Sequence, residues 1–154
     1  MNINEIVNVI DDVKNQIRDP YRLKISFSNP RDPVYVEADR LRLYQVISNL
    51  LGNAIKFTRE GTISIAAYVN DKIKDKEEEL TIAVRDDGTG IDPSIMSRLF
   101  TKFATKSEVG TGLGLYISKN IIEAHGGRIW AENNRDGRGA TFRFSLPLFK
   151  DQEH

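Results

Sequence analysis

The sequence predicts an α+β domain built in layers, with a mixed or antiparallel sheet. Three or four segments place apolar residues at helical spacing, and five or six others alternate apolar with polar residues as strands do. Hairpins dominate the connections between the strands, which is typical of α+β folds. The length of 154 residues fits one domain. We expect that domain to cover residues 1–150, with a short tail at 151–154.

Composition narrows the classes of function. Lys plus Arg and Asp plus Glu both number 22, so no net charge draws the chain to nucleic acid or to an anionic membrane. The absence of cysteine excludes a disulfide framework and thiol catalysis, and with two histidines a zinc site is not expected. No apolar run approaches membrane-spanning length, and the N-terminus lacks a signal pattern. We therefore expect a cytoplasmic domain with no nucleic-acid or membrane contact of its own.

The first part of the chain predicts one helix and two strands. Residues 3–18 repeat apolar side chains at helical spacing, and Asp19-Pro20 ends that helix. Residues 23–27 alternate apolar and polar side chains and predict a strand. Val34-Tyr35-Val36 predicts a short second strand.

The middle of the chain predicts a helix followed by a hairpin. Asp39 can cap a helix over about residues 40–57. Strands are predicted at about 62–69 and 80–86. The mixed charge run 71–79 between them indicates a solvated hairpin loop.

The last third predicts two helices and a final hairpin. A proline suits the first turn of a short helix at about 93–100, and residues 101–111 look irregular. A long helix follows at about 112–125, and the glycines after it can take a left-handed cap. Two final strands, at about 128–132 and 140–147, are joined by a turn.

Four polar residues share one stripe of the helix at 40–57. Gln45, Asn49, Asn53 and Lys56 are spaced four, four and three apart and face away from the apolar stripe. Asparagine is a poor residue inside a helix. Its carboxamide oxygen is a neutral ligand suited to Mg²⁺, and Lys56 beside it would be a charge for a phosphate. An ordinary solvated face is the alternative.

The run from Asp86 to Ile91 delivers a carboxylate into a tight backbone turn. In the functional interpretation, Asp86 accepts a hydrogen bond from the exocyclic amine of adenine, whereas guanine presents a repelling carbonyl. Gly88 and Gly90 let the backbone approach the base closely. A simple turn is the alternative, because Asp-Gly pairs are common in turns.

A glycine-rich run opens the helix that begins near residue 112. Its free amides and the positive end of the helix dipole suit triphosphate oxygens. The run is neither a P-loop nor a dinucleotide fingerprint, because neither glycine pattern is completed. A purely structural helix start is the alternative. The run comprises Gly110, Thr111, Gly112, Leu113, Gly114 and Leu115.

Residues 101–111 have the composition of a lid over such a site. Lys102 and Lys106 are candidates for phosphate contact, and two solvated lysines on a loop are an equally good interpretation. His125 lies in the last turn of a helix, where a cation favours the dipole. A structural role for His125 is therefore preferred to that of a phosphoacceptor.

Together these segments resemble the nucleotide-binding catalytic domain of sensor histidine kinases, in the superfamily shared with DNA gyrase, heat-shock ATPase chaperones and MutL proteins. The resemblance runs from about residue 3 to 147. It implies a two-layer α/β sandwich in which three helices cover one face of a mixed five-stranded sheet, with ATP under a flexible lid. The matching motifs are the asparagine box Asn49–Lys56, the first glycine box Asp86–Ile91, the phenylalanine box Phe100–Phe103, the second glycine box Gly110–Leu115 and the last glycine-rich stretch Gly137–Phe142.

The resemblance also implies ligands and contacts. It implies ATP or ADP, with Mg²⁺ on Asn53 and adenine recognition by Asp86 that Thr141 supports. Catalytic roles fall to Asn49 and Lys56, the latter through phosphate contact. The wider set of nucleotide-binding candidates adds Phe57, Gly88, Gly90, Ile91, Lys102, Lys106, Gly110, Thr111, Gly112, Leu113, Gly114 and Leu115.

One position separates branches of that superfamily. Its ATP-hydrolysing members and the anti-sigma serine kinases carry a glutamate, acting as general base, where this chain has Asn49. A carboxamide cannot take a proton at neutral pH, whereas an imidazole nitrogen is already a nucleophile. The substitution therefore favours transfer to histidine over hydrolysis. Ala140 departs from the family pattern, in which a hydroxyl residue is common.

We therefore expect the catalytic domain of a two-component histidine kinase. In a parent protein that could be membrane-anchored, it would donate the γ-phosphate of Mg·ATP to a histidine on a helical hairpin of the same or a partner protomer. The receiver domain of a response regulator would be the next partner. The hairpin is expected to precede this sequence, so the domain alone should be a monomer that binds ATP without autophosphorylating. The alternatives are an anti-sigma-type serine kinase, an ATP-hydrolysing clamp and a degenerate nucleotide-binding regulatory module.

Overall fold

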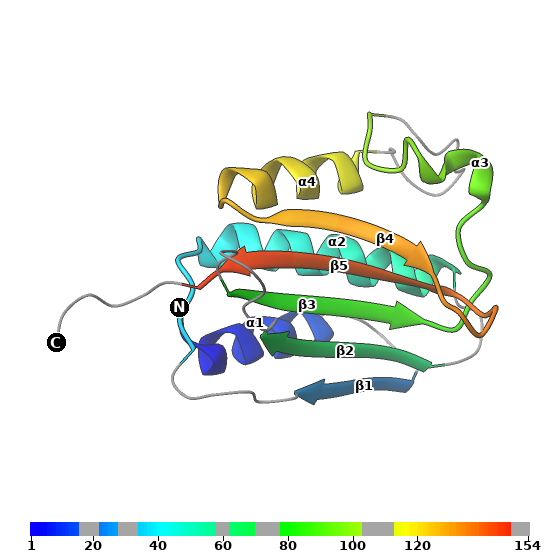
Figure 1. Ribbon diagram of the computed structural model, residues 1–154. Helices are drawn as coiled ribbons and strands as arrows, with labels where there is room; N and C mark the ends of the chain where they lie inside the picture. The colour runs from blue at the N-terminus through cyan, green and yellow to red at the C-terminus, as the bar shows by residue number, and fades with distance from the viewer. Residues whose placement is uncertain (16–21, 28–33, 58–61, 70–77, 103–112, 149–154) are drawn as a thin grey trace, which may run out of the picture.

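The computed structural model describes residues 1–15, 22–27, 34–57, 62–69, 78–102 and 113–148 (Figure 1). Residues 71–77 of the loop predicted at 71–79, most of the predicted lid and the C-terminal tail lie outside these ranges, as does the predicted helix end at 16–20. The helices are α1 (Ile3–Asn15), α2 (Arg40–Phe57), α3 (Pro93–Met96) and α4 (Gly114–Ala124). The strands are β1 (Arg22–Phe27), β2 (Thr62–Val69), β3 (Glu79–Asp86), β4 (Arg128–Asn133) and β5 (Ala140–Pro147).

The strands form one mixed sheet of five, in the order β1-β2-β3-β5-β4. β1 runs parallel to β2, and the other neighbouring pairs are antiparallel. The mixed five-stranded sheet implied by the resemblance is therefore confirmed. The register sets Ile63 opposite Asp86 and Arg85 opposite Thr141, so the end of β3 lies beside the start of β5.

Helices α1, α2 and α4 cover one face of the sheet (Figure 1). Their apolar residues recur every three or four positions, so each helix turns one apolar stripe toward the sheet. Burying one large apolar side chain contributes about 1.5–3 kcal/mol, and this layer buries many. None of the helices in the described ranges is long and apolar enough to cross a membrane. The buried residues of α1 and α2 are Ile6, Val9, Ile10, Val13, Leu43, Val46, Ile47, Leu50, Leu51 and Ala54.

The predicted ends of two helices are confirmed. Asp39 Oδ1 accepts hydrogen bonds from the amides of Leu41, at 2.9 Å, and Arg42, at 3.3 Å, and so caps α2. Gly126 follows the end of α4 with a φ of +80°, the left-handed conformation that glycine adopts most easily.

Two predicted elements are wrong: one is absent and the other is shorter than predicted. Residues 34–36 form no strand, because Tyr35 bridges to Asn2 while Val36 bridges to Leu148. The segment meets a different neighbour at each residue, so no continuous ladder can form. The helix predicted at 93–100 covers only Pro93–Met96. Beyond it the backbone bonds join residues three apart, as in successive turns.

Candidate functional site

Four segments that are far apart in the sequence meet at one end of the sandwich, on the right in Figure 1. They are the C-terminal end of α2, the end of β3 with the turn after it, the start of α4 and the start of β5. The predicted site residues of the described ranges belong to or adjoin these segments. The described parts of the asparagine box and of the first glycine box therefore lie toward the same end of the sandwich, whereas Phe103 and half of the second glycine box lie outside the described residues.

Asp86 is a buried carboxylate at the end of the sandwich where β3 ends and β5 begins. Its side chain is 2% exposed, and its Oδ1 accepts hydrogen bonds from the amides of Gly88 at 3.0 Å and Ala140 at 3.2 Å. No described residue donates a hydrogen bond to Oδ2. Burial raises the pKa of Asp86 above its ordinary value of 3.8, the two amides lower it, and the neighbouring Asp87 raises it. Ala140 contributes its backbone amide here, so this contact needs no hydroxyl side chain.

The start of β5 approaches Asp86 so closely that only glycine fits before it. A Cβ on Gly139 would stand 2.1 Å from the carbonyl oxygen of Asp86 and 2.6 Å from its Oδ1. Gly139 also has a φ of +76°. Gly90 has a φ of +80°, and a Cβ there would stand 3.0 Å from Asn133 Oδ1. Both glycines therefore lie close to a neighbouring segment, and the approach of Gly88 and Gly90 to a base stays a prediction.

Two asparagines hold the turns around Asp86, and the sequence indicated only a turn for them. Asn133 accepts from the amide of Ile91 at 2.7 Å and donates to its carbonyl at 2.9 Å. Asn134 donates to the carbonyl of Asp86 at 2.8 Å and accepts from Thr141 Oγ1 at 2.6 Å. Thr141, buried, thus reaches Asp86 through Asn134. A pair of asparagines before a strand is the sequence signal, but it does not show where their side chains point.

The polar stripe of α2 divides between two environments. The Asn49 amide donates to the carbonyl of Gly114 at 3.2 Å and to Ser118 Oγ at 3.1 Å, so it faces α4. Asn53, one turn later, is half-buried, and its side chain makes no hydrogen bond with a described residue. Lys56 is exposed. The side chain of Phe57 lies outside the described residues.

The start of α4 has no side-chain cap among the described residues. Leu113 occupies the N-cap position and supplies no side-chain cap to the amides of the first turn. The Lys102 ammonium lies 5.2 Å from the ring centre of Tyr116, which brings this exposed cation beside the same turn. Ile91 and Leu115 are buried in the apolar core. Lys106, Gly110, Thr111 and Gly112 lie outside the described residues.

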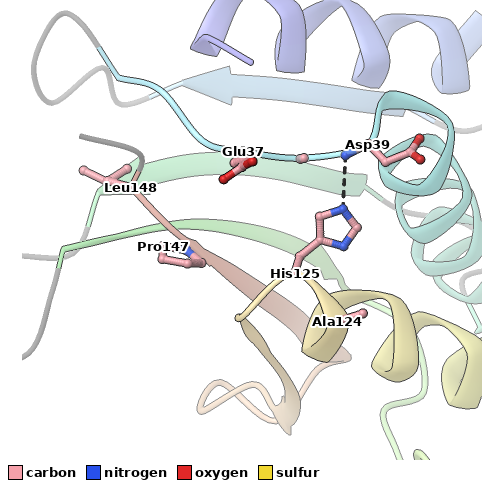
Figure 2. Close-up of a pocket in the computed structure, with 7 residues that line it drawn as sticks. Glu37, Asp39, Ala124, His125, Pro147 and Leu148 are labelled. Carbon is pink, nitrogen blue, oxygen red and sulfur yellow. Dashed lines mark hydrogen bonds between the residues drawn. The ribbon is translucent and has the colours of Figure 1, made fainter. Parts of the chain in front are cut away.

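A pocket of about 480 Å³ lies at the other end of the molecule (Figure 2). His125 forms one wall: its Nε2 accepts from the amide of Asp39 at 3.1 Å, and its Nδ1 donates to the carbonyl of Ile121 at 2.7 Å. An amide can only donate and a carbonyl can only accept, which fixes the tautomer. Both ring nitrogens are engaged in the fold, in keeping with a structural role for His125. The lining residues are Glu37, Ala38, Asp39, Ala124, His125, Pro147 and Leu148.

The sandwich and the site define a class of protein. A family model described as histidine kinase-, DNA gyrase B- and HSP90-like ATPase matches residues 38–150. The chain belongs to this ATPase family, and membership implies nucleotide binding.

Curated relatives within the family are sensor proteins. The chain is 38% identical over 131 residues to the sensor histidine kinase WalK of Bacillus subtilis, a match that covers 80% of this chain and 21% of WalK. It is 44% identical over 117 residues to the phytochrome-like protein Cph1 of Synechocystis, covering 73% of this chain and 15% of Cph1. The chain therefore spans about a fifth or less of the length of these two relatives.

Solved structures give the same result at domain level. The catalytic domain of histidine kinase ThkA is similar at 35% identity and a TM-score of 0.75, with 96% of this chain and 93% of that one covered. ShkA in complex with AMPPNP is similar at 28% identity and a TM-score of 0.75, covering 96% of this chain and 30% of ShkA. The mycobacterial sensor histidine kinase MprB, at 22% identity and a TM-score of 0.77, supports the fold alone.

Proposed function

We propose that residues 1–150 are the ATP-binding catalytic domain of a sensor histidine kinase, which presents the γ-phosphate of Mg·ATP to a histidine on a separate helical domain. The observation that carries this proposal is Asp86, a buried carboxylate with one oxygen held by two backbone amides and the other left for a donor. The similar protein ShkA was solved with AMPPNP, an analogue of ATP, which supports the same ligand class for this chain.

Recognition of the base is expected at Asp86. Its free Oδ2 would accept from the exocyclic amine of adenine, whereas the carbonyl of guanine would face it with like charge. Asn134 stabilises the turn after β3, because it donates to the Asp86 carbonyl and accepts from Thr141. Thr141 would therefore act on the base through Asn134.

The phosphates are expected between α2 and the start of α4. The uncapped amides of α4 and the exposed Lys56 and Lys102 supply positive charge there. Asn53 offers a carboxamide oxygen that no described residue uses. Mg²⁺ keeps several waters and phosphate oxygens, so one such protein ligand fits it, and bound there it would neutralise phosphate charge. No group of three or more His, Cys, Asp or Glu side chains that could hold a metal is found among the described residues.

The transfer itself would need mainly positioning and charge neutralisation. A neutral imidazole nitrogen of the acceptor histidine would form a bond to the γ-phosphorus. The bond from that phosphorus to the bridging oxygen would break, ADP would leave with the electron pair, and the ring proton would pass to solvent. Because the imidazole already has a lone pair, the carboxamide of Asn49 in place of a general base is compatible with this reaction.

The partners follow from this reaction. The acceptor histidine would lie on a helical hairpin of the same or a partner protomer, and the phosphoryl group would then pass to the receiver domain of a response regulator. We expect the catalytic domain to be cytoplasmic and, when isolated, monomeric.

The proposal is tested by binding and by transfer. Calorimetric titration should show binding of Mg·ATP and Mg·ADP, with Mg·GTP at least about tenfold weaker. With γ-labelled ATP, the chain alone should take up no label, and phosphoacceptor hairpins from relatives such as WalK should be labelled in trans. Absence of ATP binding, or label on the chain itself, would contradict the proposal. Steady hydrolysis or label on a serine would favour the alternative kinases and clamps, and binding without transfer to any hairpin would favour a regulatory module.

A further inference from the structure

We propose that Asn49 is a positioning residue that clamps α4 to α2, and that it thereby sets the first turn of α4 without touching the nucleotide. This inference rests on the proposed function, because that turn is where the phosphates are expected. It replaces the catalytic and ligand-contact roles that the sequence suggested for Asn49.

The orientation of the Asn49 carboxamide carries the inference. Its amide nitrogen lies 3.2 Å from the carbonyl oxygen of Gly114 and 3.1 Å from Ser118 Oγ. A carbonyl oxygen can only accept, so the amide and not the side-chain oxygen must face Gly114. Both bonds cross from α2 to α4, between residues 65 and 69 positions apart in the sequence.

Ser118 gives an independent reason for the clamp. It is fully buried on the apolar stripe of α4, between Leu115 and Ile122. A hydroxyl in that position loses its hydration and needs a partner within the protein. Asn49 is that partner in the described structure, because its amide donates to Ser118 Oγ.

The first residue of α4 packs on the same carboxamide. A Cβ on Gly114 would stand 3.6 Å from Asn49 Cγ, an ordinary contact distance. Gly114 also opens the turn that has no side-chain cap. We therefore expect the positions of the backbone amides in the first turn of α4 to depend on the side chain at residue 49.

A carboxylate at position 49 discriminates between a clamp and a residue that binds the metal or acts as a base. An aspartate there would have the shape of asparagine but would set a charged oxygen against the carbonyl of Gly114, and the two acceptors would repel. A metal ligand or general base, in contrast, would keep or gain function as aspartate. We therefore expect Asn49→Asp to be the more damaging change at this position, and Asn49→Ser, which is small and neutral, to be the milder one.

Nucleotide binding by four variants tests the clamp. Asn49→Asp should weaken Mg·ATP binding at least about tenfold and Ser118→Ala severalfold, while adenosine, which has no phosphates, should bind each variant within about twofold of wild type. The double variant should lose less than the product of the two single losses, because both remove one interaction. Ser48→Ala, an exposed serine beside Asn49, is the matched control and should bind as wild type.

Amide hydrogen exchange is a second measurement of the clamp. It uses Asn49→Ser and Ser118→Ala, so it tests the inference even if Asn49→Asp folds poorly. Exchange at residues 114–118 should rise in Asn49→Ser and in Ser118→Ala, with the sheet unchanged. Wild-type ATP affinity in Ser118→Ala, multiplicative losses in the double variant, or full ATP binding by Asn49→Asp would each overturn the inference. If the wild-type protein bound no nucleotide at all, the proposed function would be wrong. The clamp would then be tested by the exchange data and by the double-mutant cycle of residues 49 and 118, with the free energy of unfolding as the measured quantity.

Discussion

Asp86 combines burial with incomplete hydrogen bonding. Its Oδ1 accepts from the amides of Gly88 and Ala140, and its Oδ2 has no donor among the described residues. Burial raises the pKa of this carboxyl above 3.8, so the ionised form is disfavoured in the folded protein. A group that is destabilising in the free protein but able to accept from a ligand is typical of a binding site.

Asp86→Asn is expected to separate recognition from stability. The variant keeps an oxygen for the two amides but places an NH₂ group where adenine would donate. Loss of a hydrogen bond to a charged acceptor is worth about 1.5–3 kcal/mol, so the Kd for Mg·ATP should rise by about 10–100-fold. The melting temperature should not fall, because the buried charge is removed.

Calorimetric titration and thermal unfolding measure these two quantities. Asp87→Asn is the matched control for affinity, since Asp87 is exposed, carries the same charge one residue away and accepts from the amide of Thr62 instead of those of Gly88 and Ala140. It should keep the ATP affinity within about twofold. Wild-type affinity in Asp86→Asn would remove Asp86 from the base site, and an equal loss in both variants would point to the charge of the loop instead.

The same carboxyl should make stability depend on pH. Its folded pKa is raised above 3.8, so the folded state binds this proton more readily than the unfolded chain. The stabilisation from that proton is fully present below pH 3.8 and is lost as the pH rises through the folded pKa. Relative to Asp86→Asn, wild type should therefore lose free energy of unfolding across that window. Urea unfolding in steps from about pH 3.5 to 7 measures the difference; a constant difference, or one of opposite sign, would contradict the expectation.

At the scale of elements, the turn that leads into β5 contains two left-handed glycines with different surroundings. Gly137 has a φ of +82°, and a Cβ there would meet nothing within 4 Å. Gly139 has a φ of +76°, and a Cβ there would overlap the backbone of Asp86. The two positions share the conformational demand and differ in steric room.

Alanine at each glycine should separate these two effects. Gly137→Ala should cost about 1–2 kcal/mol of unfolding free energy, the cost of a left-handed alanine. Gly139→Ala should cost that amount and about 1–3 kcal/mol more, because β5 must move away from β3. Only Gly139→Ala should weaken ATP binding, since it displaces the Ala140 amide from Asp86. Denaturant unfolding and titration test this; equal costs in the two variants would show that the steric contact at Gly139 relaxes freely.

Local patterns in the sequence predicted most elements and few of the contacts at the site. The helix at 40–57 and the strand at 62–69 match the structure because apolar periodicity is local. Asn133 and Asn134 were not identified, because their partners lie 42 and 48 residues earlier. Ser118 appeared only as part of a helix, and nothing near it indicates Asn49. The ligand roles of Asn53 and Lys56 stay predictions.

At the scale of the whole molecule, side-chain hydrogen bonds among the described residues join α2 and α4 at two places. Asn49 bonds the start of α4, and His125, after its end, accepts from Asp39 at the start of α2. The two contacts lie toward opposite ends of the sandwich, one near the proposed phosphate site and one in the pocket of Figure 2. Substitutions at the two contacts can therefore show separately how this helix pair affects stability and how it affects nucleotide affinity.

His125→Ala should lower stability without changing nucleotide affinity. The exposed Asp39 amide would lose its acceptor, and the Ile121 carbonyl would lose the ring donor but keep the backbone amide of residue 125, at a cost of about 0.5–1.5 kcal/mol. The Kd for Mg·ATP should stay within about twofold of wild type, because the pocket lies away from the proposed base and phosphate contacts. Unfolding and titration give the two values, with Glu123→Ala, an exposed change on the same helix, as the control. A severalfold change in Kd in His125→Ala alone would show that α2 and α4 transmit the loss along their length, and the contacts at their two ends would then act as one unit.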